Sequence, residues 1–232
     1  MPLSGSYYTH GLSSAAPLVR IISSCIGCGW AKPVMTDNSV ANTGVAPASN
    51  VKGSALASRL LWIKLSKGHA GLAQVAAAAS PALQRIIARG AVLSAWYPFA
   101  LYIELNELLE REFGTGDGSL YRSLGRHGAD AHLTTIYRLF FKVGTVYWIL
   151  GRGARLWSAY YDSGKLELYT RGSHRAEMRM INFATPHKIH CANVAGWVER
   201  SVELSGGTHV VVNEISCRCD GAPHCQFVCS WQ

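Results

Sequence analysis

The feature that most constrains this chain is a group of cysteines and one glutamate near its C-terminus. Four candidate metal ligands, Cys191, Glu214, Cys217 and Cys225, follow one another at intervals of 23, 3 and 8 residues. Zinc prefers thiolate, imidazole and carboxylate ligands, and a structural zinc site takes four of them in a tetrahedron. Such a site would join distant segments and add its binding free energy to the stability of the fold.

Spacing alone leaves two alternatives open. Buried cysteines often serve as small apolar side chains without binding a metal. Three histidines in the same part of the sequence, His190, His209 and His224, are also competing ligands. The cysteine pattern therefore predicts a metal-stabilised segment without deciding its ligand set.

The composition indicates a folded chain from a reducing compartment. Apolar residues make up 49% of the 232 residues and charged residues 16%, which is enough to build a core. Seven cysteines, an odd number, argue against a secreted disulfide scaffold and favour a cytoplasmic protein. No apolar run is long enough for a transmembrane helix. The net charge of +8 favours an acidic partner mildly, and no nucleic-acid-binding module is present.

The hydrophobic pattern divides the chain into three regions. Residues 1–50 are predicted to be a poorly ordered leader with a CxxC pair, Cys25 and Cys28, which is half a metal site, a redox pair or two incidental thiols. The natural start is then expected near Met35 or Val51. Residues 51–162 show helical periodicity of apolar side chains. Within residues 163–232, apolar and polar side chains alternate, as is typical of strands, on both sides of one predicted helix. Residues 51–232 are expected to form one compact domain.

The predicted fold class is α+β, with a helical N-terminal half packed on a ββαββ antiparallel-sheet subdomain that carries a structural zinc site. Glycine, proline and capping residues set the expected boundaries of the elements. Helices are predicted over 55–67, 71–79, 82–88, 98–113, 119–142, 145–160 and 188–204, and strands over 165–170, 177–182, 209–216 and 226–231.

The C-terminal motifs resemble a known family. Gly196-Trp197, then Glu-x-x-Cys from Glu214, then Cys-x-x-x-Gly-x-x-His-Cys from Cys217 resemble the four-vinyl-reductase domain, in its version from bacterial activators that detect phenols. The resemblance implies a structural zinc ion bound by Cys191, Glu214, Cys217 and Cys225. It leaves Cys219 and Cys229 as packing residues.

The helical half, over about 96–162, resembles an uncharacterised family common in myxobacteria. Tyr97-Pro98 and Leu124-Gly125-Arg126 carry that similarity. The related superfamily includes haem-based nitric-oxide sensors and trafficking subunits that bind acyl chains. No DNA-binding or ATPase module accompanies the domain.

The resemblance implies a bacterial sensor that binds a small hydrophobic, aromatic or acyl molecule in an apolar cavity and signals through protein contacts. Five side chains before the sheet are the candidate ligand contacts: His132, Trp148, Trp157, Tyr160 and Tyr161. At helical spacing such residues also serve as ordinary core. A ligand-free interaction scaffold of the same fold is the alternative function, and a haem protein or enzyme is the third.

Basic residues concentrate on the central helices and indicate either a solvated face or a docking surface for an acidic protein partner. They are Arg122, Arg126, Arg138, Lys142, Arg152 and Arg155. A homodimer through the helical half is also expected. No GxSxG, HExxH or P-loop motif is present, and four protein ligands would leave a metal no open position, so catalysis is not expected.

Overall fold

The computed structural model describes residues 49–137, 145–170 and 172–232. The expected leader up to residue 48, with Cys25, Cys28 and the suggested start at Met35, lies outside the described residues. The elements are β1 (Asn50–Lys52), α1 (Gly53–Ala78), α2 (Pro81–Arg89), β2 (Trp96–Pro98), α3 (Phe99–Phe113), α4 (Ser119–Tyr137), α5 (Val146–Arg155), α6 (Trp157–Tyr160), β3 (Lys165–Thr170), β4 (Arg175–Ile181), α7 (Lys188–Leu204), β5 (Val211–Ser216), the 3₁₀ turn η2 (Arg218–Asp220) and β6 (Cys225–Ser230).

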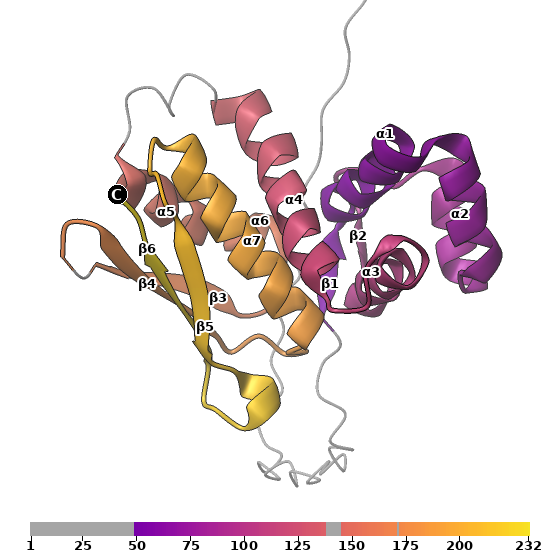
Figure 1. The fold of residues 1–232 in the computed structure, drawn as a ribbon. Coiled ribbons are helices and arrows are strands. Elements are labelled where there is room, and N and C mark those ends of the chain that lie inside the picture. The colour runs from indigo at the N-terminus through magenta and orange to yellow at the C-terminus, as the bar shows by residue number, and fades with distance from the viewer. Residues whose placement is uncertain (1–48, 138–144, 171) are drawn as a thin grey trace, which may run out of the picture. The chain divides into compact units, whose positions relative to one another are not determined.

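The C-terminal region is an antiparallel sheet with strand order β3-β4-β6-β5, and α7 connects β4 to β5. Alternate residues of β6, Cys225, Phe227 and Cys229, are fully buried, as period-2 side chains on the inner face of a sheet must be. Figure 1 shows α7 lying along this sheet with α4 beside it. The predicted α+β class and the ββαββ order are confirmed.

The N-terminal half is helical, with two departures from the predicted elements. The helices expected on either side of Gly68 form one element, α1, which is kinked where Gly68 takes a φ of 66°. The segment expected as one helix over 145–160 is split into α5 and α6 at Leu156. No helix among the described residues is long and apolar enough to cross a membrane.

A small two-stranded sheet of β1 and β2 was not predicted. Val51 pairs with Tyr97 in this sheet and forms an isolated bridge with Tyr161. The three-residue strands are too short for alternation to reveal them in the sequence. They tie the start of the helical half to the segment that leads into the large sheet.

Helices α4 and α7 cross at backbone contact, and two glycines make this possible. A Cβ atom on Gly125 would lie 2.0 Å from the carbonyl oxygen of Asn193, and one on Gly196 would lie 2.0 Å from that of Arg122. Real Cβ atoms do not approach oxygen so closely, so any side chain at either position would push the helices apart. The Gly-Trp pair of the sequence motif therefore has a packing role.

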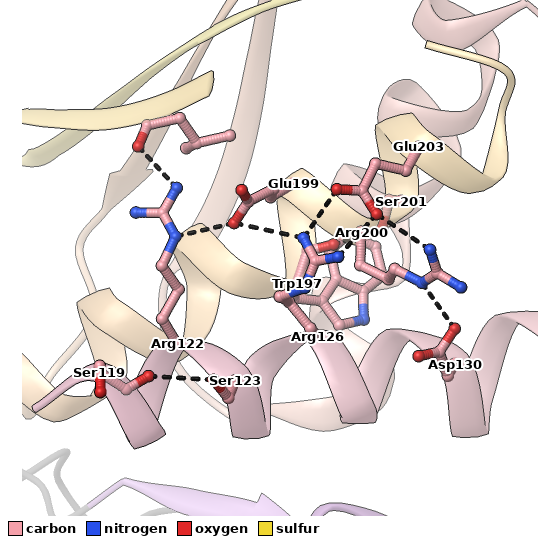
Figure 2. A network of polar contacts seen from close by, with 11 residues as sticks. Ser119, Arg122, Ser123, Arg126, Asp130, Trp197, Glu199, Arg200, Ser201 and Glu203 are labelled. Carbon is pink, nitrogen blue, oxygen red and sulfur yellow. Dashed lines mark hydrogen bonds and ion pairs between the residues drawn. The ribbon is translucent and has the colours of Figure 1, made fainter. Parts of the chain in front are cut away.

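Ion pairs surround this crossing, as Figure 2 shows. Arg126 makes two parallel hydrogen bonds of 2.8 Å each to Glu203, and Arg122 donates to Glu199 at 2.7 Å. Arg200 donates to Asp130 from α7 back to α4. These side chains are partly exposed, so each pair stabilises the fold only modestly. Arg122 and Arg126, expected on a solvated or partner-binding face, are instead paired within the chain.

Substitution of Gly125 by alanine should destabilise the protein by about 1–3 kcal/mol, because the added methyl group overpacks the α4–α7 crossing. Gly128→Ala on the same helix is the matched control, since its Cβ would meet nothing closer than 3.5 Å. That control should be neutral or stabilising by up to about 1 kcal/mol, as alanine favours helix more than glycine does. Urea unfolding of both variants measures the difference. Equal stabilities would contradict the close crossing.

Candidate functional site

A partly open cavity of about 80 Å³ lies where the helical half meets α7 and β3. Its walls are mostly apolar and aromatic, which is typical of sites for small organic ligands. The lining residues come from α1, α3, α4, α5, α6, β3, α7 and the segments next to α6: Ala55, Arg59, Tyr102, Gly125, Gly128, Gly153, Leu156, Trp157, Tyr160, Tyr161, Leu166, Asn193, Val194 and Trp197.

Among the described lining residues only Arg59 has a charged side chain, and it is 3% exposed. Its Nε donates to Asn106 Oδ1 at 3.0 Å, and Nη1 donates to the carbonyl oxygen of Leu124 at 2.9 Å. Its Nη2 donates to the Tyr102 hydroxyl at 2.6 Å and to Asn193 Oδ1. All four acceptors are neutral, and none of the ion pairs among the described residues includes Arg59.

Buried polar groups around Arg59 hold it in place. Asn193 Nδ2 donates to the carbonyl oxygen of Ile189 at 2.8 Å, and Asn106 Nδ2 donates to that of Tyr102 at 2.6 Å. Tyr161 is partly exposed to the cavity, but its phenol group is buried. This burial raises the pKa of the Tyr161 phenol well above its usual value. The phenol of Tyr161 therefore stays protonated.

Beside the cavity, His190 is enclosed in a cluster of aromatic rings. It is fully buried and lies 4.8 Å from Phe183 and 4.7 Å from Tyr161 between ring centroids, and neither of its ring nitrogens has a hydrogen-bond partner. Burial lowers the pKa of His190 to about 3, with smaller contributions from His187 and Arg59. The imidazole is neutral and belongs to the packed core.

The four predicted metal ligands meet in space at one end of α7. One ligand atom from each of Cys191, Glu214, Cys217 and Cys225 lies within 4.8 Å of the other three. The sulfur of Cys191 is 3.5 Å from that of Cys225 and 3.8 Å from that of Cys217, too far for a disulfide bond.

Local structure explains how these four residues converge. Cys191 lies in the first turn of α7, and Cys217 and Cys225 flank η2 and the turn between β5 and β6. A register shift between Glu214 and Ser216 inserts one extra residue into β5. Because neighbouring strand residues otherwise alternate faces, this bulge lets Glu214 and Cys217 turn to the same side.

The thiols differ in acidity. Hydrogen bonding from the Cys191 thiol, aided by the backbone N–H of Arg218, lowers the pKa of Cys225 to about 6. Hydrogen bonding to Cys225 together with burial raises the pKa of Cys191, and burial with the nearby Glu214 raises that of Cys217 to about 12. Cys225 is therefore the most acidic of the three thiols in the cluster.

Of the predicted pocket residues, Trp157, Tyr160 and Tyr161 line the cavity. Trp148 does not; it is 36% exposed on α5, and Arg152 lies over its ring at 5.0 Å. The side chain of His132 lies outside the described residues. Whether any of these residues contacts a ligand stays a prediction.

Sequence reasoning missed Arg59, although a signal was present. Arg59 lies three residues after Leu56 and four before Ile63, both fully buried, on the apolar face of α1. A charged residue on the core face of a helix needs an explanation, because burial of an unpaired charge is costly. His190, His209 and His224, the competing ligands, are not part of the four-residue cluster.

No protein-family model matches the chain, and no curated protein matches it. Solved structures do match. An H-NOX protein from S. oneidensis in the Fe(II)NO ligation state has a TM-score of 0.62 and 11% identity, covering 78% of this chain and 99% of its own. An Fe(II) unliganded H-NOX protein from K. algicida has a TM-score of 0.59 and 10% identity, covering 78% and 96%. An oxygen-binding H-NOX domain related to soluble guanylate cyclases has a TM-score of 0.56 and 12% identity, covering 78% and 95%. The chain shares the H-NOX fold.

These comparisons correct two expectations. The resemblance to the four-vinyl-reductase domain is wrong, since no family model matches and the similar structures are H-NOX domains. The structural zinc cofactor that the resemblance implied is wrong too, because the metal named for the similar structures is iron and the cofactor named is haem. A short cysteine pattern indicates which kinds of ligand atom are present, but it identifies neither the protein family nor the metal ion.

The cavity does not fit a haem group. Pockets for even drug-sized ligands run to about 300–1,000 Å³, and this cavity has about 80 Å³. Among the described residues, its lining contains no histidine, cysteine or methionine to ligate iron. Tyrosinate can ligate iron, but the Tyr161 phenol is protonated. His190 has free nitrogens, yet aromatic rings enclose it.

The purified protein, produced with ample haem supply, should show no Soret absorption band, because the cavity is too small for haem and its described lining offers no histidine, cysteine or methionine as an axial ligand. Visible absorption spectra before and after addition of hemin measure this. His190→Phe is the matched control and should give the same flat spectrum. A Soret band in the wild type that disappears in His190→Phe would show that the packed aromatic cluster opens to haem.

The four-residue cluster itself predicts binding of a thiophilic metal ion, because soft thiolates favour such ions. Elemental analysis should find about one transition-metal ion per purified chain, and Cys225→Ser should reduce the metal content and lower the unfolding temperature. Cys229→Ser is the control, since Cys229 is buried on the same strand but outside the cluster. A metal-free wild type would refute this prediction.

Proposed function

We propose that this chain is a sensor or binding domain for a small, mostly apolar molecule that occupies the cavity. The observation that supports the proposal is the cavity's lining, in which aromatic and aliphatic walls surround a small number of polar groups. Ligand pockets in proteins combine these two features, with the polar groups fixing ligand orientation. The shared fold with H-NOX domains is consistent with a binding role.

The cavity volume limits the ligand. A cavity of about 150 Å³ accommodates benzene, and this one has about 80 Å³ but is partly open. The ligand is therefore a short acyl-type molecule, or a single-ring aromatic that extends into the open part of the cavity.

The position of the cavity suggests how binding would be transmitted. Ala55 and Tyr102 belong to the helical half, whereas Leu166 and Val194 belong to the sheet subdomain. A ligand that contacts both groups of residues binds more tightly to one arrangement of the two halves than to others. A ligand can shift a conformational equilibrium only through such a difference in affinity. The output would be a changed protein surface for a partner.

The described lining of the cavity offers few groups for catalysis. It contains no aspartate, glutamate, histidine, cysteine, serine or lysine. General acid–base or nucleophilic catalysis depends on side chains of these types, apart from occasional tyrosines. Binding without reaction is the function that the lining supports, and the ligand-free scaffold is the competing function that an experiment must exclude.

Val194→Phe should weaken binding of neutral probes, because the larger ring fills the cavity from α7. Phenol and 1-butanol are suitable probes, and Trp157 and Trp197 in the wall report binding by fluorescence. The expected loss of affinity is about tenfold or more. Val211→Phe adds the same bulk on the exposed face of β5 and serves as the control. No binding to the wild type, or equal binding by both variants, would favour the scaffold.

A further inference from the structure

The guanidinium of Arg59 is a buried cation without a counter-ion in the described part of the chain. A guanidinium has five N–H donors, and four hydrogen bonds from Arg59 are accounted for by neutral oxygens of Tyr102, Asn106, Leu124 and Asn193. Neutral acceptors solvate a cation only in part. A buried charge that lacks a partner is costly, and proteins normally pair it.

The remaining N–H belongs to Nη1, which makes one hydrogen bond and carries two hydrogens. Gly128 lies next to this nitrogen, and a Cβ atom there would be 3.5 Å from it. Both Arg59 and Gly128 line the cavity. The absence of a side chain at Gly128 therefore leaves space beside Nη1, where a methyl group would otherwise lie in contact with it.

The charge of Arg59 also acts on its surroundings. It contributes to lowering the pKa of His127, after burial as the larger cause, so that the neighbouring imidazole adds no second cation. The other cavity walls near it are phenols, amides and apolar groups. In the described part of the lining, an anion that entered the cavity would meet one fixed positive charge and no negative one.

We infer that the ligand is a small monocarboxylate whose carboxylate pairs with Arg59 in the cavity wall, while its short apolar body contacts Trp157, Leu166 and Val194. This inference rests on the proposed function and names its ligand class. A carboxylate is the match because it is small, accepts hydrogen bonds from guanidinium groups and leaves the rest of the cavity for carbon.

The test compares isosteric probes that differ in charge. Butyrate against butyramide and benzoate against benzamide are titrated into the wild-type protein by calorimetry, with inorganic phosphate as a separate anion. The carboxylates should bind about tenfold or more tightly than their amides, as a charge-assisted hydrogen bond in a buried site predicts. Phosphate binding better than butyrate would overturn the assignment to a carboxylate.

Variants then test which residue causes the preference for carboxylates over amides. Arg59→Gln should abolish the preference for carboxylate over amide, and Arg59→Lys should retain part of it. Arg200→Gln removes an arginine of the α4–α7 ion pairs that does not line the cavity, and it should leave the preference unchanged. Because Arg59→Gln also removes buried hydrogen bonds, its folding is checked by circular dichroism, and the wild-type comparison stands without it.

The outcomes separate this inference from the proposed function. Amide binding equal to carboxylate binding in the wild type would overturn the anion site and leave the apolar binding site intact. Failure of every probe to bind would overturn the proposed function itself. A preference that survives in Arg59→Gln would assign the anion site to another residue.

Discussion

The close crossing of α4 and α7 is the constraint on which the rest of the structure depends. Gly125 and Gly196 let each helix backbone contact the other, with no room for a single methyl group at either position. This approach brings the carbonyl oxygen of Leu124 and the side chain of Asn193 within reach of the same guanidinium. Arg59 from α1 then bonds to residues of α3, α4 and α7, of which Asn193 is 134 positions away in the sequence.

The cavity and the cysteine cluster lie at different places along α7. Asn193, Val194 and Trp197 face the cavity, whereas Cys191 in the first turn faces the β5–β6 hairpin. One helix therefore positions both features, and it packs on β5 and β6 of the sheet (Figure 1). A change at either feature acts on the same rigid element.

The sequence predicted what depends on local periodicity and on short spacings. Alternation identified β3 and β4, helical spacing identified α3 and α7, and the C-terminal motifs predicted that Cys191, Glu214, Cys217 and Cys225 would meet. The sequence could not show which helix crosses which, because Gly125 and Gly196 are meaningful only as a pair. Arg59 was missed although its place on the apolar face of α1 was a signal. The family and its zinc were inferred wrongly from the same short motifs that named the four residues.

The central claim is that a carboxylate ligand pairs with Arg59 inside the cavity. A crystal structure of the protein soaked with butyrate tests it most directly. The account predicts electron density in the cavity with a carboxylate oxygen at hydrogen-bond distance from Nη1 of Arg59 and the carbon chain against Trp157 and Val194. An empty cavity at saturating butyrate, or a carboxylate directed to solvent with its chain against Arg59, would contradict it.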